Sequence, residues 1–388
     1  MNISPRHSKS GTTIFSVMSG LAAEHKAINL SQGFPDFPID ERLGTLLQEA
    51  TQGNFNQYAP MTGLPLLREA IAADFKSRYN LAIDPDTEIT VTPGATYGIF
   101  TAFTAILNPG DEVIVLEPAY DSYIPNIETN GARAITVPLK APAFTVDWNL
   151  VEAAVSPKTR AIIINTPHNP TGAVWSNSDW DHLAQLTRNT DILVLSDEVY
   201  EQIVFDKHKH QSILEHPELR ERCFALFSFG KVFHNTGWKL GYVIAPPTLT
   251  QAFRHIHQYL SFSVNTPGQY AVARYLQLPD KESVADLMQK KRDAFLDLFS
   301  PLPFTIHQPA AGSYFQTLGY ERISQLGDFD FACWLIRELG VATIPVSSFY
   351  ASGKDDKLIR FCFAKNETTL QEAASRLSVL KLHNPAFF

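Results

Sequence analysis

The sequence predicts an α/β fold with a mostly parallel, doubly wound central sheet and a smaller α/β lobe beside it. Between residues 88 and 245, short apolar runs alternate with helical stretches, as in a chain that passes repeatedly between a sheet and its covering helices. The runs at 160–165 and 191–197 have continuously apolar centres, which is typical of parallel strands buried on both faces. After Pro301 the elements become shorter, and this change predicts the second lobe.

Proline, glycine and polar clusters separate the elements, so most of them can be placed in order. Helices are expected at 12–26, 41–51, 64–79, from the turn at 93–96 to residue 107, and at 147–155. Strands are expected at 88–92, 112–116, 134–139, 160–165, 191–197, 223–229 and 240–245. Residues 248–300 should be largely helical. The lobe should contain short strands and helices at 305–308, 313–318, 329–339, 341–345, 358–364 and 367–381.

The composition is that of a globular protein and argues against two classes of partner. Of the 388 residues, 45% are hydrophobic and 19% are charged, and the formal net charge is −8. This acidic balance argues against a general nucleic-acid binder or a protein that binds anionic membranes. The short basic run at 290–292 is interpreted as a solvated helix face.

Cysteine usage and the N-terminal pattern indicate the compartment. Cys223, Cys333 and Cys362 are far apart, which fits neither a disulfide framework nor a zinc site and indicates a reducing environment. Polar residues and glycine interrupt the apolar stretch near the N-terminus, so no signal peptide is expected. No apolar run reaches membrane-spanning length. We therefore expect a cytoplasmic protein.

Several polar residues follow the ends of predicted parallel strands. Asn169 follows the strand at 160–165, and Asp197 lies at the tip of the strand at 191–197. Ser228 and Lys231 both lie at the end of the strand at 223–229, and Tyr120 follows the strand at 112–116. Because open α/β sheets bind ligands at the carboxyl ends of their strands, these side chains should converge on one edge of the sheet.

Lys231 has Phe229, Val232 and Phe233 as sequence neighbours. Burying an ammonium is costly unless it is paired or loses its proton. An imine is one chemical solution, so Lys231 is a candidate for holding an aldehyde cofactor as a Schiff base. The alternative is a lysine at a strand end whose charged tip reaches solvent. A Walker-type phosphate loop is excluded, because it requires Ser or Thr at position 232.

Gly94, Ala95 and Thr96 form a tight turn between a strand and a helix start. Free N–H groups and the helix dipole make such a turn an anion site, although many similar turns hold no ligand. Gly33 and Tyr58 are interpreted with the same alternatives, as ligand contacts or as ordinary loop residues. His208 and His210 have the spacing of metal ligands but lack a third, so a surface turn is expected there and no metal site.

Three motifs, in this order and spacing, carry a resemblance to a known family. They are Asn-Pro-Thr-Gly at 169–172, Asp-Glu-Val-Tyr at 197–200, and Ser-Phe-Gly-Lys at 228–231 followed after seven residues by Lys239. Together they resemble the class I and II aminotransferases, which are pyridoxal-phosphate enzymes of fold-type I, nearest to the methionine and kynurenine–glutamine aminotransferase branch. The resemblance implies a large pyridoxal-phosphate-binding domain at 40–275. It also implies a small domain made of residues 1–39 and 276–388.

By this resemblance, Lys231 joins the cofactor's aldehyde carbon and, once substrate frees it, moves the proton between the amino acid Cα and the cofactor. Asp197 pairs with the pyridine nitrogen and keeps it protonated. Asn169 and Tyr200 hydrogen-bond the phenolic oxygen, and Tyr120 stacks on the ring face.

The resemblance also implies the groups that hold phosphate and substrate. The phosphate contacts are Gly94, Ala95, Thr96, Ser228, Lys239 and, from the second subunit of a homodimer, Tyr58. Arg360 clamps the substrate α-carboxylate with its planar guanidinium, assisted by Asn169 and Gly33. Phe34 is expected to line the substrate site.

Two departures from the family pattern bear on specificity. Lys239 stands where many relatives have arginine, so the charge is kept but the planar fork is lost. Relatives that act on aspartate or glutamate carry an arginine before a Ser-Asn-Pro-Pro segment, and residues 259–267 contain none. With residues 349–350 also expected near the site, an apolar, aromatic or sulfur-containing donor is predicted.

The predicted activity is a ping-pong transfer of the amino group from such an L-amino acid (methionine, phenylalanine, kynurenine or glutamine) to a 2-oxo acid. The alternative is a carbon–sulfur β-lyase that acts on cysteine conjugates. A pyridoxal-phosphate-binding regulator without catalysis is a remote alternative, because the chain has no basic helix suited to DNA.

Overall fold

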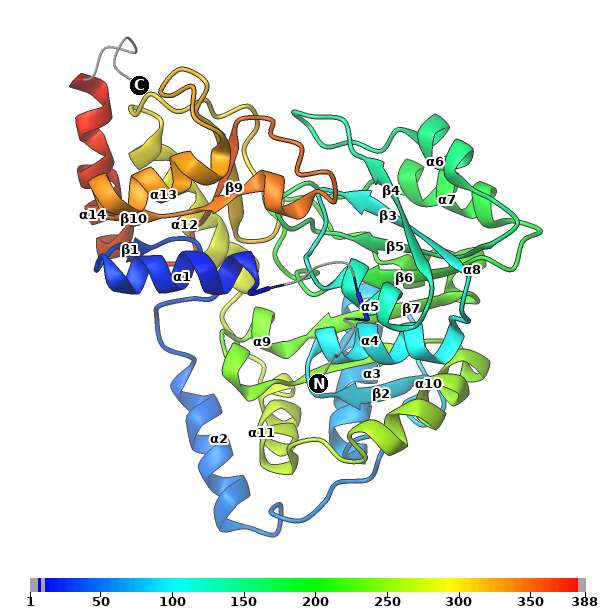
Figure 1. Ribbon diagram of the computed structural model, residues 1–388. Coiled ribbons are helices and arrows are strands. Elements are labelled where there is room, and N and C mark those ends of the chain that lie inside the picture. The colour runs from blue at the N-terminus through cyan, green and yellow to red at the C-terminus, as the bar shows by residue number, and fades with distance from the viewer. Residues whose placement is uncertain (1–5, 8–10, 383–388) are drawn as a thin grey trace, which may run out of the picture.

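The centre of the computed structural model, which describes residues 6–7 and 11–382, is a seven-stranded sheet (Figure 1). Its strands, β2 to β8 in chain order, are Ile89–Thr92, Glu112–Glu117, Arg133–Pro138, Thr159–Asn165, Leu193–Asp197, Cys223–Ser228 and Gly241–Ile244. In space the order is β2-β8-β7-β6-β5-β3-β4. Strand β8 runs antiparallel to both neighbours, and every other adjacent pair is parallel. The predicted mostly parallel sheet is confirmed.

Alternate residues of each central strand feed two hydrophobic cores, one on each face of the sheet. On β5, Ala161 and Ile163 belong to the core under α4 (Ala95–Ile106), whereas Ile162 and Ile164 belong to the opposite core. All four side chains are at most 1% exposed. The continuous apolar run that predicted a parallel strand is therefore explained by burial on both faces.

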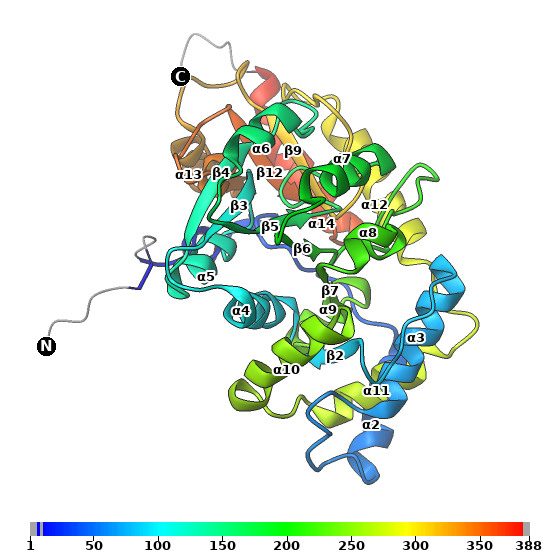
Figure 2. The same cartoon turned by 90° about the vertical axis from the view of Figure 1, so that its right-hand side faces the viewer.

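Helices cover both faces of the sheet, as Figure 2 shows from the side. The core under α4 also contains side chains of α5 (Tyr123–Thr129) and α10 (Pro247–Leu260). The opposite core takes in α2 (Glu41–Gln52), α3 (Pro65–Tyr79), α6 (Trp148–Ala154), α7 (Asn177–Thr187) and α11 (Thr266–Leu276). The short helices α8 (Pro217–Arg220) and α9 (Phe229–Val232) flank β7.

A second lobe is built on a three-stranded antiparallel sheet in the order β11-β12-β9. These strands are Ile344–Pro345, Leu358–Cys362 and Phe315–Gly319, and the lobe's helices are α12 (Val284–Phe299), α13 (Asp328–Leu339) and α14 (Glu367–Leu377).

The N-terminal segment joins this lobe. Strand β1 (Ile28–Asn29) pairs in parallel with β10 (Val341–Ala342), and α1 (Ile14–Glu24) shares a core with α13 (Figure 1). The segment at 14–29 and the elements at 328–342 thus lie side by side, although they are far apart in the sequence. The domain boundaries given above stay a prediction.

Three local expectations in the backbone are wrong in detail. Residues 305–308 contribute only one bridge, from Thr305 to Gly319, because Pro303 and Pro309 flank the segment and cannot donate to a ladder. The element at 341–345 is divided, since β10 pairs with β1 while β11 pairs with β12. The strand at 223–229 ends at Ser228, and Phe229 starts the helical turn α9, so Lys231 lies on a helix.

Two expectations about surface charge are also wrong. Arg292, at the end of the basic run 290–292, is only 4% exposed and donates to both carboxylate oxygens of Asp206 at 2.6 and 2.7 Å. His210 is 3% exposed rather than on a surface turn, and its Nε2 lies 2.8 Å from Glu198 Oε2. In both cases a carboxylate distant in sequence pairs with the buried side chain.

No helix in the part of the chain that the structure describes is long and apolar enough to cross a membrane.

Candidate active site

A cavity of about 310 Å³ lies at the carboxyl ends of the parallel strands, between the large sheet and the second lobe. With the exception of Tyr58, all the predicted site residues line it: Gly33, Phe34, Gly94, Ala95, Thr96, Tyr120, Asn169, Asp197, Tyr200, Ser228, Lys231, Lys239 and Arg360. Strands β5, β6 and β7 bring their ends to one edge, as expected for neighbouring parallel strands.

Lys231 extends from α9 into this cavity. Its Nζ donates to Gly33 O at 3.4 Å and lies 5.7 Å from the ring centres of Tyr200 and Tyr314. Lys231 makes no ion pair with a carboxylate of the described residues. Burial lowers the pKa of Lys231 to about 8, although the charge of Asp197 opposes the shift. Most of the amine is still protonated near physiological pH, but roughly a tenth to a fifth is neutral and nucleophilic, far more than for an ordinary lysine.

Asp197 is the last residue of β6 and is 4% exposed. Tyr123 Oη donates to its Oδ2 at 2.6 Å, and the Val199 backbone N–H donates to its Oδ1 at 3.4 Å. Burial raises the pKa of Asp197 to about 6, while these hydrogen bonds and the charge of Lys231 lower it. The carboxyl is thus ionised at neutral pH and is aimed into the cavity.

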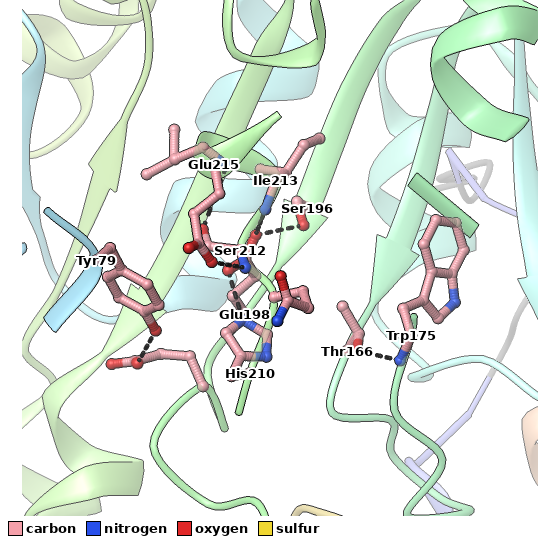
Figure 3. Close-up of polar contacts among 12 residues, drawn as sticks. Tyr79, Thr166, Trp175, Ser196, Glu198, His210, Ser212, Ile213 and Glu215 are labelled. Atoms are coloured by element: carbon pink, nitrogen blue, oxygen red, sulfur yellow. Dashed lines mark hydrogen bonds and ion pairs between the residues drawn. The ribbon is translucent and has the colours of Figure 1, made fainter. Parts of the chain in front are cut away.

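The turn after β6 is anchored by hydrogen bonds to residues that do not line the cavity (Figure 3). Fully buried Glu198 accepts hydrogen bonds from Ser196 Oγ at 2.8 Å, Ile213 N at 3.0 Å and His210 Nε2 at 2.8 Å. Tyr79 Oη donates to Glu201 at 2.9 Å. The three bonds to Glu198 fix the backbone next to Asp197, whereas the Tyr79 bond holds only Glu201, farther along the turn.

Arg360 comes from β12 of the second lobe and is fully buried. Its Nη1 donates to Asn169 Oδ1 at 2.7 Å and its Nη2 to Ser31 O at 2.6 Å, whereas Nε has no hydrogen-bond partner among the residues that the structure describes. Arg360 forms no ion pair with a carboxylate among the described residues. Burial lowers the pKa of Arg360 to about 10, so it stays charged at neutral pH and favours an anionic ligand.

The start of α4 forms an anion cradle. Gly94 has φ +81° and no side chain caps the helix, so its first N–H groups are available. A Cβ at Gly94 would lie 3.4 Å from Lys239 Nζ, and one at Gly241 would lie 2.5 Å from Phe227 O. Gly241 therefore allows a close approach of backbone segments that a larger residue would obstruct, whereas at Gly94 the positive φ favours glycine and the Lys239 ammonium lies beside it.

Tyr58 lies away from the cavity of its own chain. It is 83% exposed and packs edge-on against Phe262 at 5.5 Å, beside a separate hollow that residues 263–267 line. Phe34 is at the cavity edge, 45% exposed, with its carbonyl accepting from Lys365 Nζ at 2.8 Å.

Sequence reasoning missed several residues that the fold brings to the site. Phe15 and Gln32 line the cavity from the N-terminal segment, and Phe315 lies under the Arg360 guanidinium at 3.9 Å. Tyr123 reaches Asp197 from α5, and Tyr314 Oη donates to Gly33 O at 2.6 Å. No local pattern in the sequence places any of them at the site.

The fold and this set of side chains define a pyridoxal-phosphate-dependent transferase. The chain belongs to the aminotransferases of class I and II, whose family model matches residues 25–377. The methionine aminotransferase of Escherichia coli is 47% identical over 95% of this chain and 96% of that protein. The mouse kynurenine–oxoglutarate transaminase 1 is 35% identical over 92% of each chain.

The solved structures agree with these similarities. A structure from Escherichia coli, described as identifying a methionine aminotransferase function, is 46% identical and superposes with a TM-score of 0.94. It covers 97% of this chain, and this chain covers 99% of it. The protein is thus a pyridoxal-phosphate-dependent aminotransferase.

The cavity fits this cofactor. A phosphate matches the uncapped helix start at Gly94 with Lys239 beside it, an aldehyde matches the buried, partly neutral amine of Lys231, and a protonated ring nitrogen matches the buried carboxylate of Asp197.

The lowered pKa of Lys231 predicts how cofactor-free protein takes up pyridoxal phosphate. Because the neutral amine reacts and the pKa is about 8 rather than 10.5, the rate of uptake should rise with pH up to about 8 and then level off. Stopped-flow absorbance measures it, with Lys231→Arg as a control that should form no covalent adduct. A rate that still climbs between pH 9 and 10 would contradict the lowered pKa.

Proposed function

We propose that the enzyme moves the α-amino group of an apolar, aromatic or sulfur-containing L-amino acid to a 2-oxo acid by a ping-pong reaction, with methionine as the first candidate donor. The observation that carries the proposal is the surroundings of Arg360. Its guanidinium lies 3.9 Å from the ring centre of Phe315 and 5.3 Å from those of Phe15 and Phe349. Aromatic rings suit an apolar substrate side chain.

Two cations of the cavity, Lys239 and Arg360, each suit one anion of the bound cofactor and substrate. Lys239 beside Gly94 suits the cofactor phosphate, and Arg360 suits the substrate α-carboxylate. Among the described residues that line the cavity, no further guanidinium is available for a side-chain carboxylate. Aspartate would therefore bury a second, unpaired charge, which is unfavourable. The names of the Escherichia coli and mouse relatives support the same class of donor.

The cofactor, when bound, supplies an aldehyde and an electron-accepting ring. Lys231 is proposed to hold that aldehyde and afterwards to carry the proton to and from the substrate Cα, since its amine titrates near neutral pH. Asp197 is proposed to keep the ring nitrogen protonated through its buried negative charge. Asn169 and Tyr200 would hydrogen-bond the phenolic oxygen, and Tyr120 would stack on the ring.

The remaining contacts are proposed for phosphate and substrate. Gly94, Ala95 and Thr96 would donate backbone N–H groups to the phosphate, with Ser228 and Lys239 assisting. Asn169 already orients Arg360 through its Oδ1, so its amide N–H₂ stays available for the substrate. The Gly33 amide and the Phe34 ring would complete the substrate wall.

A homodimer is proposed in which Tyr58 of the partner subunit reaches the phosphate. Its support is a group of exposed large side chains at the end of α10: Phe262 (51% exposed) packs against Tyr58, and Tyr259 (86%) and Leu260 (49%) precede Phe262 in the chain. Burying such a group of large side chains favours association. The large domain at 40–275, the small domain from 1–39 and 276–388, and a cytoplasmic location belong to the same proposal. The free cysteines are consistent with that location.

The comparisons do not favour the carbon–sulfur β-lyase, because the relatives reported above are named as aminotransferases. They also give no support to a regulator without catalysis.

A donor panel tests the substrate class. Methionine and phenylalanine should give kcat/KM values at least about 100-fold above that of aspartate, because aspartate places an unpaired carboxylate among aromatic rings. Loss of the visible cofactor band on adding the donor alone, and its return with a 2-oxo acid, measures each half-reaction. Aspartate as the best donor would contradict the proposal.

Arg360→Lys tests the substrate clamp. The variant keeps the charge but loses the planar fork that Asn169 and Ser31 orient, so kcat/KM for methionine should fall roughly 10- to 100-fold, the usual worth of a hydrogen bond to a charged group. Steady-state kinetics measure the loss, with Arg292→Lys as a control buried arginine outside the cavity. A value equal to wild type would contradict the clamp.

Mixed dimers test the partner contact. Lys231→Ala and Tyr58→Ala should each be impaired in homodimers because each site lacks one group. After subunit exchange, a mixed dimer has one site with both lesions and one intact site, so activity should exceed that of either parent. Activity that stays at the parental average would argue that Tyr58 serves its own subunit or neither site.

A further inference from the structure

We propose that Tyr123 is a positioning residue that holds the Asp197 carboxylate in its charged, inward-facing state for the cofactor's ring nitrogen. This inference rests on the proposed role of Asp197. Tyr123 follows Tyr120 by three residues but does not line the cavity itself. Its hydroxyl acts on the site through Asp197, and its ring packs edge-on against that of Tyr120 at 5.7 Å.

The geometry of the contact is that of a charge-assisted hydrogen bond. Tyr123 Oη donates to Asp197 Oδ2 at 2.6 Å, within the range of an O–H donor on a carboxylate. Both groups are buried, Tyr123 at 2% and Asp197 at 4% exposure. In such surroundings a donor is worth more than in water, and an unpaired carboxylate is correspondingly costly.

The backbone of Asp197 is fixed independently of Tyr123. Asn165 Nδ2 donates to the Asp197 carbonyl at 2.8 Å, and the next residue, Glu198, is tied by three donors that do not line the cavity (Figure 3). What remains free is rotation of the carboxyl group. Within the described part of the chain, Oδ1 accepts only the long 3.4 Å bond from Val199 N, so Tyr123 supplies the short bond that sets the orientation of the carboxyl group.

The charged and titratable groups that face Asp197 shift its pKa in opposite directions. They are Lys231 from α9, Glu198 and Tyr200 from the turn after β6, Tyr120 from the loop after β3, and Tyr123 from α5. Burial raises the pKa of Asp197 to about 6, and the Tyr123 hydrogen bond is the first of the influences that lower it. Without that bond the carboxyl would bind its proton closer to neutral pH.

Tyr79 provides a matched control. It is another tyrosine whose hydroxyl donates to a buried carboxylate, Glu201, at 2.9 Å, but it lies outside the cavity. Tyr79→Phe removes the same kind of bond and should leave the protonation of Asp197 unchanged.

The test is an infrared titration of cofactor-free protein, followed by kinetics of the holoenzyme. The protonated-carboxyl band that Asp197→Asn removes should titrate near pH 6 in the wild type. In Tyr123→Phe its midpoint should rise by about one pH unit, and in Tyr79→Phe it should not move. In the Tyr123→Phe holoenzyme, the acidic limb of the pH profile of kcat should shift to higher pH by a similar amount, while KM for the amino donor stays unchanged.

An unchanged midpoint in Tyr123→Phe would overturn the proposal. If that variant does not fold, 3,5-difluorotyrosine at position 123 keeps the shape and makes the hydroxyl a stronger donor, so the midpoint must then move down. Failure of the proposed function would appear differently. The visible spectrum of the wild type would not respond to any amino donor, while the infrared midpoints would be unaffected.

Discussion

The site depends on keeping an amine, a guanidinium and a carboxylate buried in one cavity. Each of these groups is strongly hydrated in water, and none forms a side-chain ion pair in the described structure that would offset its burial. The fold stabilises them with fixed dipoles instead. Asp197 accepts hydrogen bonds from the Tyr123 hydroxyl and from a backbone N–H. Arg360 donates to a backbone carbonyl and to a side-chain amide oxygen. The incomplete compensation lowers the pKa of Lys231 to about 8 and raises that of Asp197 to about 6.

The N-terminal segment is the common element of this arrangement. The carbonyl of Ser31 accepts from Arg360, and that of Gly33 accepts from both Lys231 and Tyr314. Lys365 holds the next carbonyl, that of Phe34. The short irregular stretch at 31–34 thus turns its acceptors toward the cations of the site and lines one side of the cavity. Its position follows from the pairing of β1 with β10, which attaches it to the second lobe.

The sequence interpretation failed where a distant partner decides the outcome. The basic run at 290–292 has the pattern of a solvated face, yet Arg292 is buried because Asp206 pairs with it. The sequence around His210 predicts an exposed loop, yet its imidazole is buried and hydrogen-bonded to Glu198 (Figure 3). Tyr123, Phe15 and Phe315 likewise reach the site from elements whose placement no local pattern specifies. Such contacts depend on tertiary packing, which overrides local preference.

By itself, the sequence determined the parallel sheet, the order of its strands along the chain and the residues at their ends. These features follow from local rules, because buried parallel strands need continuous apolar runs and their carboxyl ends meet at one edge. The tertiary structure alone decided which side chains face one another across that edge, and therefore how strongly each is buried and charged. Burial and charge are properties of the surroundings of a side chain, and those surroundings come from six or more separate segments brought together only on folding.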